Sequence, residues 1–170
     1  MKTRKLIFLA LLTGLAVIIS LFESMIPIPI IVPGAKLGLS NIIILTTLIV
    51  FGFRSALTVS MLKSVLFMLV SGSVSSMFFS LAGAIFATCT MYVVYRFFSR
   101  IFSLIGVSIF GALAHNLGQL TVAVLIMKNP YIYSYASVLV LTGLFTGFFV
   151  GLSASYVVPG LKRHVYREEN

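Results

Sequence analysis

Apolar residues occur in long runs along this chain, separated by short segments that hold most of its polar residues, glycines and prolines. Each run is close to the length of about 20 apolar residues that a helix needs to cross the hydrocarbon core of a bilayer. The pattern predicts an all-α, polytopic integral membrane protein, with six transmembrane helices in a single domain over residues 1–170. The expected spans are about residues 6–26, 37–53, 55–70, 74–94, 106–127 and 133–158.

The segment at residues 27–36 interrupts this pattern most strongly. Pro27, Pro29, Pro33 and Gly34 do not continue a helix, because proline lacks the backbone N–H and glycine favours turns. We expect an ordered, extended loop here, on the side of the membrane opposite the chain termini. Such a loop is a candidate lid for a site in the outer half of the bundle.

Composition supports membrane insertion and argues against a soluble enzyme. The chain is 60% hydrophobic and 9% charged, whereas soluble domains are about half apolar and about a quarter charged. Its mean hydropathy is +1.16. The 12 Lys and Arg residues could indicate nucleic-acid binding, but they lie singly or in small clusters between apolar runs, as loop charges of membrane proteins do. We therefore expect no nucleic-acid partner.

The basic residues also predict the orientation of the chain. With six spans, one side of the membrane receives most of the Lys and Arg residues, and the other side receives only Lys36 and Lys128. Positively charged loops stay in the cytoplasm, so both termini are expected there. The residues on the expected cytoplasmic side are Lys2, Arg4, Lys5, Arg54, Arg96, Arg100, Lys162, Arg163 and Arg167.

The scarcity of acidic residues limits the chemistry that the chain can perform. It contains no aspartate, and its acidic residues are Glu23, Glu168 and Glu169. A Mg²⁺ site for diphosphate chemistry usually needs several converging carboxylates, and the single Cys89 builds neither a disulfide framework nor a thiolate cluster. There is also no G-x-x-x-x-G-K-[ST] phosphate-binding loop, so any ATP-driven step belongs to a partner. We expect no catalytic activity, no metal and no cofactor.

Small residues repeat at a spacing of four in two of the expected helices. Gly143, Gly147 and Gly151 form a stripe along the last span, and Ala10 and Gly14 form a shorter pair in the first. Small residues on one face let another helix approach closely. The stripes therefore predict either packing within the bundle or an interface with a partner helix.

Polar residues inside the apolar runs are the main candidates for a functional site. An ionisable side chain at membrane depth is costly and normally faces a cavity or a partner. These residues fall in the middle or outer half of the membrane, where they could form an outward-facing pocket. In the alternative interpretation, each polar side chain has its own partner inside the bundle. Lys63 would then pair with Glu23, and Asn41 would cap a helix. The candidates for substrate binding are Glu23, Lys36, Asn41, Lys63, His115, Asn116 and Gln119.

Two motifs resemble those of a known bacterial family. Residues 33–41 read PGAKLGLSN, and residues 111–120 read GALAHNLGQL. The chain resembles the Gx transporter family, also labelled heptaprenyl diphosphate synthase component I. Members of that family are similar to the substrate-capture S components of energy-coupling factor (ECF) transporters. The residues that the resemblance marks as functional are Lys36, Gly38, Asn41, His115, Asn116 and Gln119.

The resemblance has two implications for function. Kinship with S components implies a six-helix bundle in the bacterial cell membrane that captures a small cofactor or precursor, related to vitamins, flavins, quinones or isoprenoids. Its partners would be a transmembrane T component and ATPase subunits. The synthase label instead implies a non-catalytic accessory to a soluble prenyl synthase subunit, in isoprenoid and menaquinone synthesis.

Transport is the function that the polar residues favour. A polar cluster in the outer half suits capture from outside, and the missing ATP-binding motif suits a chain that relies on a partner. Lys36 and Lys63 would neutralise an anionic part of the ligand. A third alternative is a non-catalytic assembly protein, which would need no pocket.

Overall fold

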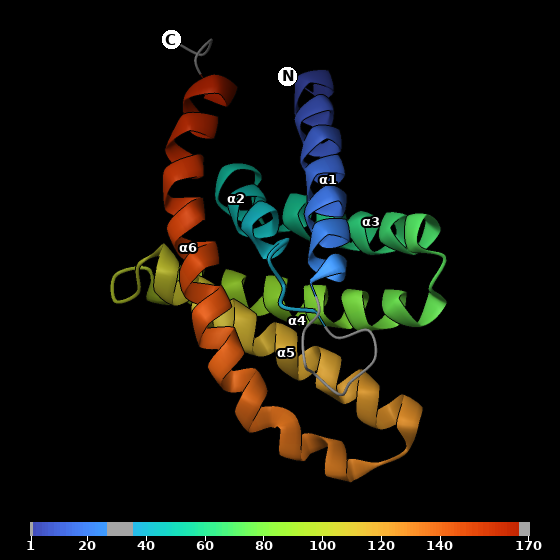
Figure 1. Ribbon diagram of the computed structural model, residues 1–170. Helices are drawn as coiled ribbons and strands as arrows, with labels where there is room; N and C mark the ends of the chain where they lie inside the picture. The colour runs from blue at the N-terminus through green and yellow to red at the C-terminus, as the bar shows by residue number, and fades with distance from the viewer. Residues whose placement is uncertain (1, 27–35, 167–170) are drawn as a thin grey trace.

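The computed structural model describes residues 2–26 and 36–166, and all the regular structure in these ranges is helical (Figure 1). Five of the helices are long and apolar enough to cross a membrane. These features confirm an all-α, polytopic membrane protein. The expected loop at residues 27–35 lies outside the described residues. The helices are α1 (Lys2–Met25), α2 (Asn41–Phe51), α3 (Phe53–Ser71), α4 (Val74–Phe98), α5 (Leu104–Met127), the 3-10 helix η1 (Pro130–Tyr135) and α6 (Ala136–Tyr166).

The second expected span, residues 37–53, is much shorter than predicted. Helix α2 has 11 residues, which gives a length of about 16 Å, against a hydrocarbon core of about 30 Å. Glycines in the left-handed region bound it, because Gly38 has φ +83° and Gly52 has φ +84°. Apolarity predicted a full span here, but these two backbone turns restrict α2 to a half-helix.

Two other helices run beyond their expected ends. Helix α4 continues to Phe98 rather than ending near residue 94, and α6 continues through Pro159 to Tyr166 rather than ending near residue 158. The last turn of α6 carries Arg163 and His164, whose position suits the partial negative charge at a helix C-terminus.

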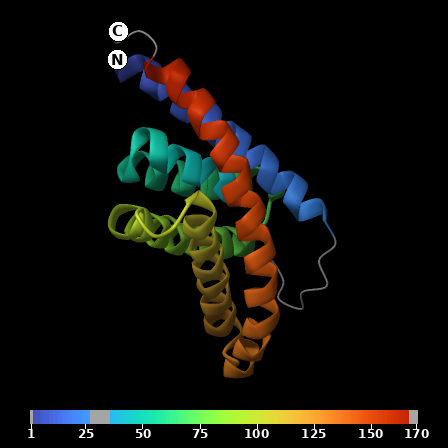
Figure 2. The same ribbon diagram turned by 90° about the vertical axis from the view of Figure 1, so that its left-hand side faces the viewer.

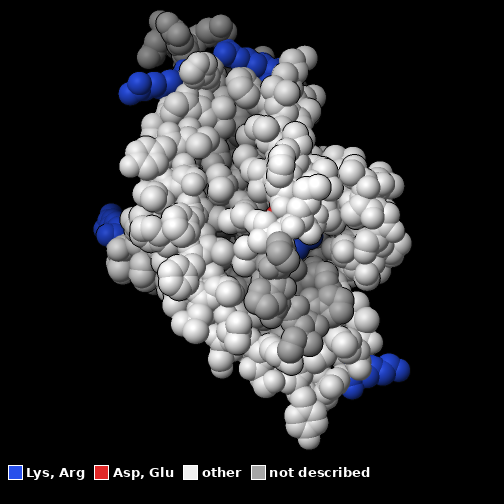
Figure 3. All heavy atoms as spheres, viewed as in Figure 1, with Lys and Arg blue, Asp and Glu red and all other residues white. Residues whose placement is uncertain are grey.

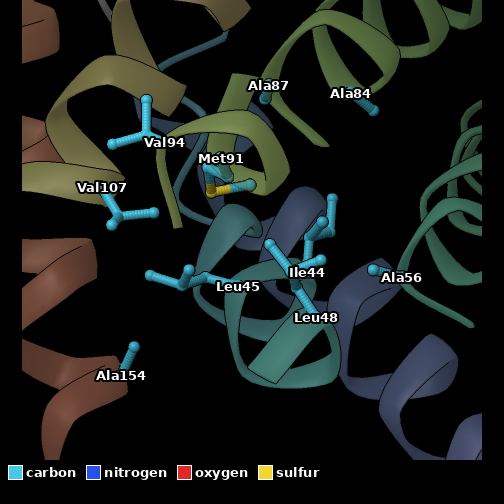
Figure 4. Close-up of a cluster of buried hydrophobic side chains, with 10 residues drawn as sticks. All are labelled: Ile44, Leu45, Leu48, Ala56, Ala84, Ala87, Met91, Val94, Val107 and Ala154. Atoms are coloured by element: carbon cyan, nitrogen blue, oxygen red, sulfur yellow. The ribbon is translucent and has the colours of Figure 1, made fainter. Parts of the chain in front are cut away.

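Helix α2 lies at the centre of the bundle, where it contacts all five long helices. Its side chains Ile44, Leu45 and Leu48 are buried at 3% exposure or less. Figure 4 shows these side chains surrounded by residues from the neighbouring helices. The remaining members of this core are Ala56, Ala84, Ala87, Met91, Val94, Val107 and Ala154.

The outer surface of the bundle is apolar. Phe22 on α1 is 67% exposed, and Phe145 on α6 is 71% exposed. Figure 3 shows one face that is almost entirely uncharged, with Lys and Arg at its upper, left and lower right edges and only small patches of charged atoms near its middle. Apolar side chains this exposed are suited to contact with lipid rather than with water.

The beginning of α1 and the end of α6 lie on the same side of the bundle (Figures 1 and 2). Arg4 Nη2 donates a hydrogen bond of 2.7 Å to the His164 carbonyl, which joins the beginning of α1 to the end of α6. This arrangement brings the two ends of the described helical bundle together, and that the termini share one side of the membrane stays a prediction. That this side is the cytoplasm stays a prediction from the loop charges.

The glycine stripe of α6 packs against α5 within the chain. A Cβ atom on Gly147 would lie 2.6 Å from Ile109 Cα, and one on Gly151 would lie 2.4 Å from Ile105 Cα. Gly143 also faces α5, where its nearest neighbour is the side chain of Asn116. The structure thus uses this stripe for internal packing.

The small residues of α1 face outward instead. Ala10 is exposed, and a Cβ on Gly14 would meet no atom within 4 Å.

Candidate functional site

A buried polar centre forms where the segment 36–40 passes between the helices. We use the term polar centre for Glu23 of α1, Lys36, Gly38 and Ser40 of this segment, Asn41 of α2, Lys63 of α3, and His115 and Gln119 of α5. Every one of these polar side chains is at most 7% exposed. The structure therefore brings together six of the seven expected binding residues, and it joins the two sequence motifs in space.

Glu23 holds the segment from the side of α1. Its Oε1 atom accepts a hydrogen bond from the Gly38 backbone N–H, while Oε2 has no hydrogen-bond partner. The ammonium groups of Lys63 and Lys36 both attract this carboxylate. Glu23 is therefore the local counter-charge for two lysines.

Lys63 approaches the segment from the middle of α3. Its Nζ donates a hydrogen bond of 2.8 Å to Ser40 Oγ, and its side chain is 1% exposed. This bond takes the place of the direct Lys63–Glu23 pair expected in the alternative arrangement. Asn41 also departs from that alternative, because neither of its side-chain polar atoms has a hydrogen-bond partner. It therefore caps no helix.

Lys36 is held at its backbone, whereas its ammonium group makes no hydrogen bond. The Lys36 N–H donates to Gln119 Oε1 at 3.2 Å. Its Nζ lies 2.9 Å from the centroid of the Phe67 ring and has no hydrogen-bond partner. A cation over an aromatic face is attracted by the ring quadrupole. The ring face is therefore a close stabilising contact of this ammonium, in addition to the attraction of the Glu23 carboxylate.

The imidazole of His115 lies in a narrow space between two glycines. A Cβ on Gly83 of α4 would lie 2.7 Å from His115 Cε1, and one on Gly38 would lie 3.0 Å from His115 Cδ2. Neither ring nitrogen has a hydrogen-bond partner. Both glycines are therefore needed for the ring to lie beside the segment.

Asn116 does not belong to the polar centre. Its Nδ2 donates a hydrogen bond of 2.7 Å to the Leu139 carbonyl of α6. His115 and Gln119 are four residues apart and share a face of α5, but Asn116 is turned toward α6 and has its own partner. Its expected binding role has no support from the geometry.

The polar centre contains more unpaired polar atoms than an ordinary protein interior. Buried polar groups are hydrogen-bonded in the great majority of cases, and each exception needs a physical reason. Four of the seven unpaired atoms are donors when the imidazole is neutral, and one of the four is the charged ammonium of Lys36, which suits an anionic ligand. The unpaired atoms of the centre are Glu23 Oε2, Lys36 Nζ, Asn41 Oδ1 and Nδ2, His115 Nδ1 and Nε2, and Gln119 Nε2.

Three contributors were not expected from the sequence. Ser40 and Gly83 are too common in type to stand out among apolar residues. Phe67 carried a weak signal, because it follows Lys63 by four residues and so shares its face of α3. An aromatic residue one turn from a buried lysine is a useful pattern to search for.

Two hollows away from the polar centre contain little polar surface. A groove of about 520 Å³ between α4 and α5 is lined only by apolar side chains, among them Phe78, Phe86 and Ile126. A hollow of about 50 Å³ between α5 and α6 includes Asn116. In the part of the chain that the structure describes, no group of three or more His, Cys, Asp or Glu residues could hold a metal.

The fold and the site define a polytopic α-helical membrane protein with a charged centre buried between its helices. A family model described as heptaprenyl diphosphate synthase component I matches residues 12–157. The chain belongs to this family, as its two motifs indicated. The match includes every residue of the polar centre. No curated protein and no solved structure matches the chain.

Proposed function

We propose that this protein is a membrane-embedded, substrate-binding subunit of a transporter of the energy-coupling factor type. Its ligand would be a small anionic cofactor or precursor related to vitamins, flavins, quinones or isoprenoids. The observation that supports this proposal is the polar centre, which places two ammonium groups and one carboxylate in an otherwise apolar bundle. A bundle that needed only to pack would not need these groups.

Charge balance favours an anion as the ligand. When both lysines and Glu23 are ionised, the centre has one positive charge in excess, and the unpaired amide groups of Asn41 and Gln119 add donors. A buried charge without a partner is costly, and a bound anion would remove that cost. Lys36 is the ammonium with no hydrogen bond, so it is the first candidate to contact the ligand.

The energy for transport would come from partners. The sequence has no phosphate-binding loop, so a transmembrane T component and ATPase subunits would drive the change between outward-facing and inward-facing states. With both termini in the cytoplasm of a bacterial cell, the polar centre would lie in the middle or outer half of the membrane. Capture from outside follows from that orientation.

Native mass spectrometry tests the proposal directly. The protein would be purified in mild detergent and measured untreated, then with flavins, prenyl diphosphates, quinone precursors and vitamins. We expect one small anionic ligand to remain bound, and Lys36→Met or Lys63→Met to weaken its binding by about 10-fold to 100-fold, the effect of losing one charged hydrogen bond. Lys128→Met is the matched control, because Lys128 is exposed at the far end of α5.

The controls distinguish anion capture from lost folding and from a general effect of removing a lysine. The Lys128→Met variant should bind as the unmodified protein does. Variants that elute as one monodisperse species show that lost binding is not lost folding. Binding of neutral or cationic compounds only, with affinity unchanged by Lys63→Met, would contradict the capture of an anion.

The family description supports a second candidate function. The chain would be a non-catalytic membrane component that associates with a soluble prenyl synthase subunit, which would supply the carboxylates for Mg²⁺. Co-purification of an empty protein with such a subunit would favour this candidate. For that role, or for an assembly protein, Lys63→Ala and His115→Ala should leave association intact.

A further inference from the structure

Two residues of α3, one helical turn apart, hold the two ends of the segment 36–40. Lys63 donates to Ser40 Oγ at 2.8 Å, and the Phe67 ring centroid lies 2.9 Å from Lys36 Nζ. Residues four apart on a helix lie on the same face, so both contacts come from one surface of α3. The segment is thus fixed at its beginning and at its end by this helix.

The contact at Lys36 differs from that at Lys63. Lys63 has a hydroxyl acceptor, while Lys36 Nζ has no hydrogen-bond acceptor and faces the aromatic ring. Phe67 is 2% exposed, so water does not compete for this contact. An aromatic face attracts a cation without accepting a directed N–H bond from it. The ammonium is therefore held in place and still has its donors free.

We infer that Phe67 is a positioning residue, which holds the Lys36 ammonium at the polar centre ready for the anionic group of the ligand. This inference rests on the proposed function, because a ligand gives the placement its use. The anion would approach the free donors of Lys36 while the ring keeps the lysine side chain from folding away. A leucine at position 67 would fill much of the space but offer no quadrupole.

The first test measures the contact without any ligand. In protein labelled with ¹³C-lysine, the ε-methylene signal of Lys36 is assigned by its loss in Lys36→Met. We expect this signal to be shifted upfield by the ring current of Phe67, to stay shifted in Phe67→Tyr, and to lose the shift in Phe67→Leu. An unshifted signal, or a shift that survives Phe67→Leu, would overturn the inference.

The second test measures the use of the contact, with inorganic pyrophosphate as the probe. We expect pyrophosphate to move the Lys36 signal, and Phe67→Leu to bind it about tenfold more weakly, while Phe67→Tyr retains most of the affinity. Phe79→Leu is the matched control, because Phe79 is also buried, at 4% exposure, but packs in a separate apolar cluster.

The outcomes of the two tests are distinguishable. If Phe67→Leu and Phe79→Leu weaken pyrophosphate binding equally, Phe67 acts through general packing and the positioning role is wrong. If pyrophosphate leaves the Lys36 signal of the unmodified protein in place, capture of such an anion fails and the positioning role fails with it. The ring-current shift would then show the cation–π contact alone.

Discussion

Glu23→Gln should lower the free energy of unfolding by about 3–5 kcal/mol, which is the usual cost of leaving a buried charge without its partner. The glutamine oxygen can still accept the Gly38 N–H bond, so the substitution removes charge and little else. Lys36 and Lys63 would then be two buried cations without a counter-charge. Thermal and denaturant unfolding in detergent measure the loss.

A second substitution separates charge from packing. Glu23→Gln combined with Lys36→Met removes one cation as well, so the double variant should recover a large part of the stability that Glu23→Gln loses. Interacting residues show such non-additivity in double-mutant cycles. A Glu23→Gln variant that unfolds like the unmodified protein would mean that Glu23 is neutral in the bundle, and the charge balance proposed for the site would be wrong.

Gly151→Ala should destabilise the bundle by about 1–3 kcal/mol, as overpacking of a well-packed interior does. The new Cβ would lie 2.4 Å from the Ile105 backbone, which cannot rotate aside as a side chain can, so α5 and α6 would have to separate. Gly147→Ala should act in the same direction, since its Cβ would lie 2.6 Å from Ile109 Cα. Thermal unfolding midpoints in one detergent measure both variants.

Gly14→Ala is the control for these variants. Gly14 lies inside a helix with no atom within 4 Å of the new Cβ, so alanine should be neutral, or should stabilise by up to about 1 kcal/mol through helix propensity. Equal destabilisation at positions 14 and 151 would contradict the close packing of α5 on α6. A strong effect at Gly14 alone would instead indicate that the outer face of α1 has a partner.

Hydrophobicity was sufficient to predict five of the helices, because the length of an apolar run reports directly on a span. It failed for α2, whose sequence is as apolar as a span but is bounded by Gly38 and Gly52. The extension of α6 beyond residue 158 was also not predicted, because Pro159 and the basic residues after it are atypical of a helix in lipid. Backbone turns and helix ends depend on local conformation, and the average hydrophobicity of a run of residues does not report on that conformation.

The polar centre could be predicted in part for a different reason. A charge inside an apolar run, or directly beside one, is conspicuous, so Glu23, Lys36 and Lys63 were identified by residue type. Which of them touch could not be predicted: Lys63 bonds Ser40, and Lys36 faces Phe67. Asn116 shows the same limit, because one residue of helical rotation turns it from the centre toward α6. Charged residues in an apolar sequence indicate that a site exists. Which residues belong to the site depends on how each helix is rotated about its own axis.

The shortness of α2 also constrains how the protein is made. A helix of 11 residues is too short to rest in lipid as an independent span, and polar residues stand at its start, with Ser40 before it and Asn41 as its first residue. Its covering helices include α6, which is synthesised after α3, α4 and α5. During translation, α2 must therefore wait at the bilayer surface or beside α3 until α6 has been made. The second helix in sequence is among the last to reach its final surroundings.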